Sequence, residues 1–415
     1  MPKNQVKILP FPLFCNDFSF VFPQLFLLVS SLLFYPILLS NYEEIVKIDK
    51  AKLPSDAVFK GYSDKVIQGI LITTDNVLYK REVYYSKSEN KTYTASLNTG
   101  LNETSFSPEL KTWIIKMYFE FRMSEILIHL FLEGIGISIS EGEISNILIM
   151  DHQEEFTLEK ENILITGIEY SEGHNIDDSG FKENGINKYI NIICSPLFSY
   201  YTVNDNKKGE TIKEMFETLN TKGKPLTCDD APQWYKITDV LIQLCWVHEE
   251  RHYKKLDPIF MSHMEELRLK REQIWDFYKA LKAYKKNPDE KLKELLSKMF
   301  DKIFDVSSDY KALDKRLKLT YAKKKELLLV LDYPNIDIHN NLSENGIRPV
   351  VIKRKISNGT RTENGTIAWE NQLSILSTCK KHNINYFDYI LDIFNGNKNN
   401  QSLVDLIKQK STIFS

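Results

Sequence analysis

The sequence predicts an α/β fold in which a mixed sheet is interrupted by a long helical insertion. After Gly173, three apolar runs are followed by a helical stretch from about Lys208 to Leu219 and then by a fourth apolar run. Three neighbouring strands, a helical crossover and a further strand are what a mixed sheet requires. After His248, apolar residues recur at helical spacing for about eighty residues, with a break at Asn287-Pro288. The sheet domain is expected to resume near Tyr333-Pro334.

The composition is that of a globular protein. Of the 415 residues, 42% are hydrophobic and 27% are charged, which is enough apolar material for a large core and excludes a disordered chain. The formal net charge is -2, so any binding of nucleic acid must come from local basic patches. The cysteines are odd in number and lack a Cys-x-x-Cys pair, which argues against a disulfide framework and a four-cysteine zinc site and favours a reducing compartment. They are Cys15, Cys194, Cys228, Cys245 and Cys379.

The first forty-five residues carry a separate signal. Phe18 to Leu39 contains no charged residue, and a helix of that length would just span a bilayer core. Pro23 and Pro36 interrupt the segment, and no small-residue cleavage site follows it. Two interpretations stay open, namely a membrane anchor or uncleaved signal, and a misread start before a body that begins near Asn41.

Shifts in pattern divide the chain into seven segments. Ser107-Pro108 predicts a helix start, Ser140 and Glu143 have capping-box spacing, and Gly134-Ile135-Gly136 predicts a tight turn. Three short helices of this kind indicate either a helix-turn-helix or an ordinary helical bundle. The segments are an apolar N-terminal segment of uncertain status (1–45), a small β-rich module (46–100), a helical DNA-binding-like unit (105–170), the first part of the core (171–248), the helical insertion (249–333), the second part of the core with a third acid (334–395) and a C-terminal tail (396–415).

Three acids stand out at element ends. Asp177 is predicted on the first strand, Asp229 at the end of the fourth, and Glu344 at a helix start after Asn341. Carboxylate oxygens are the ligands that Mg²⁺ prefers, and two such ions can clamp the attacking and leaving oxygens of a phosphodiester. Each acid also has a plainer explanation as a turn or capping residue. Asp178 and Asp230 remain alternatives to their neighbours, because adjacent strand residues point to opposite faces.

A competing pattern is His248-Glu249-Glu250-Arg251-His252. Two histidines four apart on a helix with an intervening glutamate are typical of zinc proteases. Together with the apolar N-terminus, this pattern would give a membrane-anchored zinc metalloprotease. Cys245 and His248 also offer two metal ligands, which by themselves do not complete a site.

Several blocks, in one order, resemble a known family. The chain is similar to the bacterial insertion-sequence transposases of the type numbered sixty-six over roughly Ala51 to Leu403. The blocks are AKLPSDAVFKGYSDKVIQ, GISISEGEISNIL, HNIDDSGFKENGINKYI, LTCDDAPQW, LCWVHEERHYKKLDP and HNNLSENGIRPVVIKRK. The resemblance implies a ribonuclease-H-like core with a helical insertion, and an Asp, Asp, Glu triad that binds two Mg²⁺ or Mn²⁺ ions and falls on Asp177, Asp229 and Glu344.

Two further groups of residues lie within the blocks that carry the resemblance. Four cations follow Glu344 closely and are candidates for holding DNA phosphates. They are Arg348, Lys353, Arg354 and Lys355. A second block has no assigned role. It contains Cys245, His248, Arg251 and His252.

The expected activity is cleavage of element ends, which frees a 3′-hydroxyl that attacks target DNA. The resemblance implies DNA as partner, a homo-oligomer assembled on it, and a cytoplasmic, nucleoid-associated protein. The chain departs from the family pattern at His339, where an acid is usual, at Asn358 and Thr360, and in lacking a cysteine-rich zinc module. The alternative is therefore a catalytically inactive, DNA-binding remnant of a transposase.

Overall fold

A computed structural model describes residues 43–97, 104–207, 210–219, 221, 223–396 and 401–414. The apolar segment from Phe18 to Leu39 lies outside these residues, so its status stays a prediction. The chain divides into two units, Met1–Thr73 and Thr74–Ser415. Within the described part of the chain, no helix is both long enough and apolar enough to cross a membrane.

The described part of the first unit contains one short helix, η1 (Lys50–Lys52), which Asp49 caps through a hydrogen bond from Ala51 N–H. The second unit opens with the hairpin β1 (Val83–Ser86) and β2 (Lys91–Thr94). Residues 66–72 belong to the segment expected to be a β-rich module, but they form no strand, and Ile67 and Leu71 are exposed. A strand needs a partner for its backbone groups, and these residues have none among the described ones.

Four helices follow, one more than the sequence predicted. They are α2 (Pro108–Phe119), α3 (Glu125–Gly134), α4 (Glu141–Ile149) and α5 (Gln153–Tyr170). The expected caps are confirmed, because Ser107 Oγ accepts from Leu110 N–H and Ser140 Oγ accepts from Glu143 N–H at 3.1 Å. The helices are not a separate lobe, since α2 packs on α14 (Tyr386–Asn395) and α5 packs on α13 (Glu363–Lys381).

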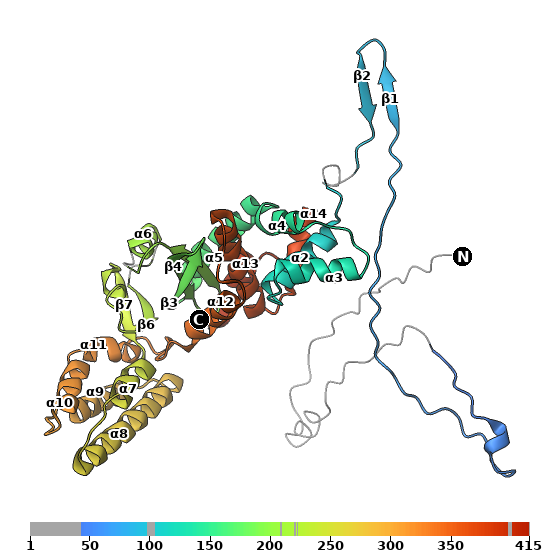
Figure 1. The fold of residues 1–415 in the computed structure, drawn as a ribbon. Coiled ribbons are helices and arrows are strands. Elements are labelled where there is room, and N and C mark those ends of the chain that lie inside the picture. The colour runs from blue at the N-terminus through green and yellow to red at the C-terminus, as the bar shows by residue number, and fades with distance from the viewer. Residues whose placement is uncertain are drawn as a thin grey trace. The chain divides into compact units, whose positions relative to one another are not determined.

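The sheet has five strands and is mixed (Figure 1). Its strand order is β5-β4-β3-β6-β7, with β3, β4 and β5 antiparallel and β6 and β7 parallel to β3. The strands and the crossover helix are β3 (His174–Glu183), β4 (Ile186–Cys194), β5 (Ser199–Asn204), α6 (Glu210–Thr218), β6 (Lys224–Cys228) and β7 (Val240–Leu244). The predicted order of three strands, a helix and a fourth strand is confirmed. The fifth strand, β7, was not predicted.

The outer edge of β5 is covered rather than free. Helix α13 lies along it and supplies side-chain acceptors to successive outward N–H groups: Thr378 to Ser199, Ser374 to Tyr201 and Glu370 to Val203. An uncovered edge strand would offer unpaired backbone groups to another chain. Buried polar residues in α13 therefore have a structural role.

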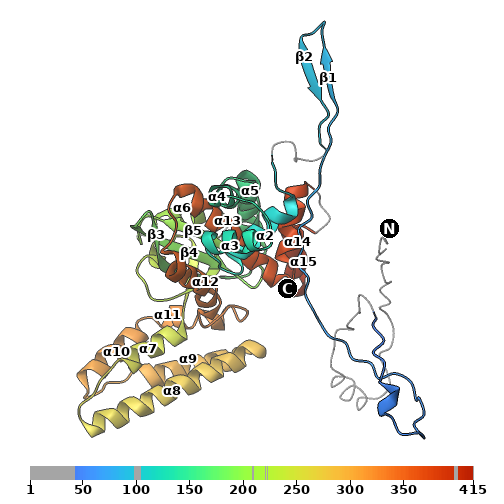
Figure 2. The ribbon, with the colours of Figure 1, turned by 45° about the vertical axis from the view of Figure 1, so that its right-hand side comes forward.

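The insertion is helical, as the sequence predicted (Figures 1 and 2). It contains α7 (Trp246–Lys254), α8 (Met261–Lys286), α9 (Glu290–Phe304), α10 (Lys311–Tyr321), α11 (Lys324–Leu327) and the turn η3 (Leu329–Leu331). The predicted break falls between α8 and α9. The insertion has its own aromatic core, in which Trp246 contacts Phe277 and Phe300 contacts Phe304, with ring centroids 5.3 and 4.6 Å apart.

Helix α12 (Asn341–Ser357) brings the third acid back to the sheet, and α15 (Leu403–Phe414) closes the described chain against α5. Helix α12 packs on β3 and β4. Its approach is close at Gly346, where an added Cβ would lie 2.2 Å from Ile192 Cδ1. Tyr201 donates a hydrogen bond of 2.8 Å to Gly346 O from the same sheet. Glycine at this position is what allows α12 to lie so near the strands.

Candidate metal centre

Asp177 lies on β3, and Asp229 directly follows the end of β6, the strand beside β3. Strands β3 and β6 are parallel, and Asn175 pairs with Thr227. Asp177 and Asp229 each lie two residues beyond that pair, since 177 − 175 = 2 and 229 − 227 = 2. Side chains two residues apart on a strand share a face, and neighbouring strands are about 5 Å apart. The carboxylates of Asp177 and Asp229 therefore project from adjacent positions.

The neighbouring acids differ from these two in their partners. Asp178 forms an ion pair with Lys207 at 2.8 Å, and Asp230 pairs with Lys323. Among the described residues, no lysine or arginine pairs with Asp177 or Asp229. The alternatives Asp178 and Asp230 therefore form ion pairs with lysines. Asp177 and Asp229 have no basic side chain as an ion-pair partner among the described residues.

Among the described residues, hydrogen-bond donors contact Asp229 through one of its two carboxylate oxygens. Its Oδ1 accepts from Trp234 Nε1 at 2.7 Å and from Ala231 N–H at 3.2 Å. Trp234 is fully buried in the short turn η2 (Trp234–Lys236). A carboxylate fixed through one oxygen presents the other in a defined direction. No pattern in the sequence indicated this role of Trp234, apart from its place five residues after the acid.

Glu344 lies in the first turn of α12, and buried hydrogen bonds position that turn. Asn340 is the N-cap, one residue earlier than predicted, and is 0% exposed. Its Nδ2 donates to Ile176 O at 2.8 Å, and its Oδ1 accepts from Asn175 Nδ2 at 3.3 Å. The start of α12 is therefore tied to the two residues that precede Asp177 on β3.

The charges of the three acids act on one another. The pKa of Asp177 is raised to about 7, first by burial and then by the negative charges of Asp229, Asp178 and Glu344. A hydrogen bond of 2.9 Å from Asp178 N–H to Asp177 Oδ1 opposes this rise. A buried carboxylate whose pKa is raised by other acids lies in a concentration of negative charge that a divalent cation would relieve.

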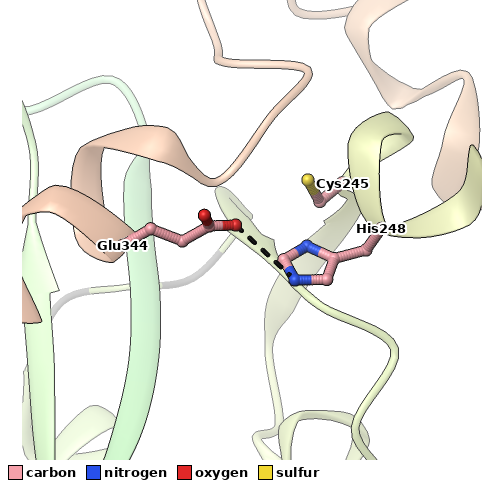
Figure 3. Close-up of side chains that lie close together, drawn as sticks. All are labelled: Cys245, His248 and Glu344. Atoms are coloured by element: carbon pink, nitrogen blue, oxygen red, sulfur yellow. Dashed lines mark ion pairs between the residues drawn. The ribbon is translucent and has the colours of Figure 1, made fainter. Parts of the chain in front are cut away.

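Glu344 is also close to the block of uncertain role (Figure 3). Its Oε1 lies 3.5 Å from His248 Nε2, and its Oε2 lies 3.7 Å from Arg251 Nη2. Cys245, the buried N-cap of α7, brings its thiol to the same place, and donor atoms of Cys245, His248 and Glu344 all lie within 4.8 Å of one another. The sequence did not predict this meeting, because 344 − 248 = 96 residues separate the two elements.

The zinc-protease pattern does not form a protease site. Glu249, which would be the general base, is buried and bound by Arg316, whose Nη2 lies 2.6 Å from each carboxylate oxygen. Thr320 donates a further hydrogen bond to Glu249. His252 lies near the same arginine, and burial, followed by the charge of Arg316, lowers its pKa. Glu249 is therefore committed to the insertion core and is not free to activate water.

The four candidate phosphate contacts divide into two pairs. Lys353 is buried, donates to Met123 O at 2.8 Å and lies over the Tyr118 ring, and burial lowers its pKa to about 8. Arg354 donates to a backbone carbonyl of β3. Arg348 and Lys355 are exposed on α12.

Comparisons with known proteins support the family resemblance. A family model described as the Transposase IS66 family matches residues 103–368. "Uncharacterized protein y4jO" of Sinorhizobium fredii (strain NBRC 101917 / NGR234) is 40% identical over 149 residues, which are 36% of this chain and 46% of that protein. The match thus spans less than half the length of that relative. No solved structure matches the chain.

Proposed function

The chain belongs to the IS66 transposase family, and we propose that it is a DDE-type transposase that cuts the ends of an insertion sequence and joins them to target DNA. Asp177, Asp229 and Glu344 would be its catalytic acids and metal ligands. The observation that carries this proposal is the parallel register that sets Asp177 beside Asp229, with the charge of Glu344 reaching the same carboxylate.

The residues present fit a pair of divalent cations. Asp177 and Asp229 have no basic partner among the described residues, and the pKa of Asp177 is raised by burial and then by its acidic neighbours. Hard cations such as Mg²⁺ or Mn²⁺ take carboxylate oxygens. When bound, two such ions would supply charge neutralisation and activation of the attacking oxygen in phosphodiester cleavage and strand transfer.

The protein's own residues would position the reacting groups. Asp177 gives up its proton to act as a ligand, and Trp234 keeps Asp229 turned so that one oxygen stays available. Asn340 fixes the turn that carries Glu344. Arg348 and Lys355 are exposed on the same helix and would contact phosphates of the DNA backbone, whereas Lys353 and Arg354 already have partners inside the protein.

The proposal extends to fold and assembly. We assign the five-stranded mixed sheet to the ribonuclease-H-like type, because one proposed acid lies on β3, one directly follows the adjacent strand β6, and one lies on a helix that returns after a helical insertion. The helices of residues 105–170 would contact the DNA outside the cleavage site. The protein would act as a homo-oligomer on element ends at the nucleoid.

The test is cleavage of DNA that carries the inverted repeats expected to bracket the reading frame. Asp229→Asn should abolish Mg²⁺-dependent cleavage and leave DNA binding intact. Asp230→Asn is the matched control, because Asp230 is held by Tyr235 at 2.8 Å and by Lys323. This control should retain most of the activity.

Two outcomes would contradict the assignment. One is cleavage by the Asp229→Asn protein at the wild-type rate, and the other is equal loss in both variants. DNA binding by a wild-type protein that cuts nothing would favour the inactive remnant instead.

A further inference from the structure

The cluster of Cys245, His248 and Glu344 contains three different metal-ligand types on two elements that are distant in sequence (Figure 3). We propose that it binds one transition-metal ion of the Zn²⁺ class, and that this ion withdraws Glu344 from the catalytic triad. The binding half of the inference stands on the cluster alone. The inhibitory half rests on the proposed function of Glu344.

The geometry needs little adjustment for a tetrahedral ion. Ligands at about 2.0–2.3 Å from zinc lie about 3.3–3.8 Å from one another. His248 Nε2 and Glu344 Oε1 are already 3.5 Å apart, and the full set lies within 4.8 Å. Rotation of the Cys245 and His248 side chains would close the remaining gap of about 1 Å. Water would complete the fourth position.

The donor set favours a transition metal over Mg²⁺. Thiolate and imidazole are soft or borderline ligands that suit zinc and its neighbours, whereas magnesium requires oxygen. The cluster therefore differs in chemistry from the all-carboxylate site of Asp177 and Asp229, although it shares Glu344 with that site. A Glu344 carboxylate drawn to the transition metal would be drawn away from Asp177 and Asp229, so the two sites would compete for it.

The thiol of Cys245 lies among backbone N–H donors. Its Sγ accepts a hydrogen bond of 3.2 Å from Asn340 N–H, and the backbone N–H groups of Val247 and His248 at the start of α7 also point to it. Burial raises the pKa of this thiol, and these donors oppose the rise. Backbone N–H groups that point at sulfur stabilise a thiolate once a metal displaces its proton.

Two enclosed atoms in the cluster lack hydrogen-bond partners. They are His248 Nδ1 and Glu344 Oε1. The contact between His248 Nε2 and Glu344 Oε1 has an ion-pair distance without hydrogen-bond geometry. Enclosed polar atoms without partners are uncommon in native proteins and often mark an ion site. This observation is independent of the spacing of the three ligands.

Arg251 places its positive charge beside His248 and Glu344, at the position that the metal ion would affect. Its guanidinium lies 3.0 Å from His248 Nε2 and 3.7 Å from Glu344 Oε2. The side chain is 47% exposed and can turn into solvent. In the metal-free protein Arg251 therefore partly neutralises Glu344, and it leaves when the ion binds.

The binding test uses the full-length protein, stripped with chelator and titrated with Co²⁺ in place of zinc. Co²⁺ bound to a thiolate in a four-coordinate site gives an intense charge-transfer absorption and visible bands. The expected result is one Co²⁺ per chain with that absorption, displaced by one equivalent of Zn²⁺. Cys245→Ser, which keeps a hydrogen-bond acceptor, should lose the charge-transfer absorption and weaken Co²⁺ binding by more than roughly tenfold. Cys379→Ala is the matched control in α13 and should behave as the wild type.

A wild-type protein without the thiolate absorption would overturn the metal site, as would a Cys245→Ser protein that retains it. Circular dichroism and thermal melting of each variant show whether it is folded, and His248→Gln supplies a second variant that should weaken Co²⁺ binding if the first is not folded. None of these measurements depends on DNA cleavage.

The inhibitory half is tested by adding Zn²⁺ to cleavage assays that contain excess Mg²⁺. Zinc at one to two equivalents should remove most of the wild-type activity and a much smaller fraction of the activity of Cys245→Ser. Co²⁺ binding without zinc inhibition would overturn the competition for Glu344 and leave the site itself standing. A wild-type protein that binds Co²⁺ as expected and never cuts DNA would instead refute the proposed function.

Discussion

Asp177→Asn should make the metal-free protein more stable at pH 8, although it removes a proposed catalytic group. The pKa of Asp177 is raised from 3.8 to about 7 in the folded protein. An acid of this kind binds more protons in the folded state than in the unfolded state between those pH values. Stability therefore falls as pH rises through that window, and the full deficit is present above pH 7. Asparagine carries no charge and escapes the deficit.

The magnitude follows from the size of the shift. About three pKa units correspond to at most about 4 kcal/mol, and Asp177 is only partly buried, so solvent screening reduces the expected gain to roughly 1–3 kcal/mol. For a protein of this size the gain corresponds to a rise in melting temperature of about 1–4 °C. Asparagine also keeps the oxygen that accepts from Asp178 N–H.

The assay is thermal unfolding in chelator at pH 5 and at pH 8. Wild type should lose stability relative to Asp177→Asn as pH rises, and saturating Mg²⁺ should narrow the difference, because the ion binds the folded wild type more tightly. Asp178→Asn is the control, since it removes the partner of Lys207 and should gain nothing. The reasoning is refuted if Asp177→Asn melts at or below the wild-type temperature at pH 8 in chelator.

Three further predictions concern stability, each measured by urea unfolding. Gly346→Ala should cost about 1–3 kcal/mol, because its Cβ would meet Ile192 at 2.2 Å. Arg316→Ala should cost about 3–5 kcal/mol, because Glu249, with a side chain 3% exposed, would keep a buried charge without its partner. Burial lowers the pKa of His174 from 6.5 to about 3, so the unfolded chain alone takes up that proton as pH falls through this window, and stability should fall with it. His174→Gln should flatten that part of the pH curve.

The first two of these predictions have matched controls. Gly142→Ala adds a Cβ that meets nothing nearer than 3.9 Å and should be neutral or slightly stabilising. Arg268→Ala breaks only exposed ion pairs and should change the stability little. Equal losses for Gly346→Ala and its control, or for Arg316→Ala and its control, would contradict the packing and charge arguments. An unchanged pH curve in His174→Gln would contradict the third.

The sequence predicted those parts of the fold that depend on local periodicity. The strand order around Asp177, the helix starts at Ser107 and Ser140 and the helical insertion all follow from patterns within a few turns or strands. Strand β7 was missed, because its five residues run directly into α7 without a turn signal. Residues 66–72 are rich in residues that favour strands but form no strand, since a local preference cannot supply a partner strand.

The three acids remain predicted ligands, whereas the surroundings of the candidate site could not be predicted from the sequence. Asp177, Asp229 and Glu344 were named from element ends and family blocks, and the parallel register agrees with a shared face for the first two. No sequence pattern could show that Asp178 has a lysine partner, or that Cys245 lies beside Glu344, because both facts depend on contacts between distant segments. Burial of Lys353 was hidden for the same reason.

One backbone hydrogen bond joins the two ends of the helical insertion. Trp246 N–H donates to Ile338 O at 3.0 Å, so the chain leaves the sheet and comes back at a single point. Loop-closure cost grows only slowly with length. We therefore expect that a shorter or longer insertion could join the same two ends without displacing Glu344.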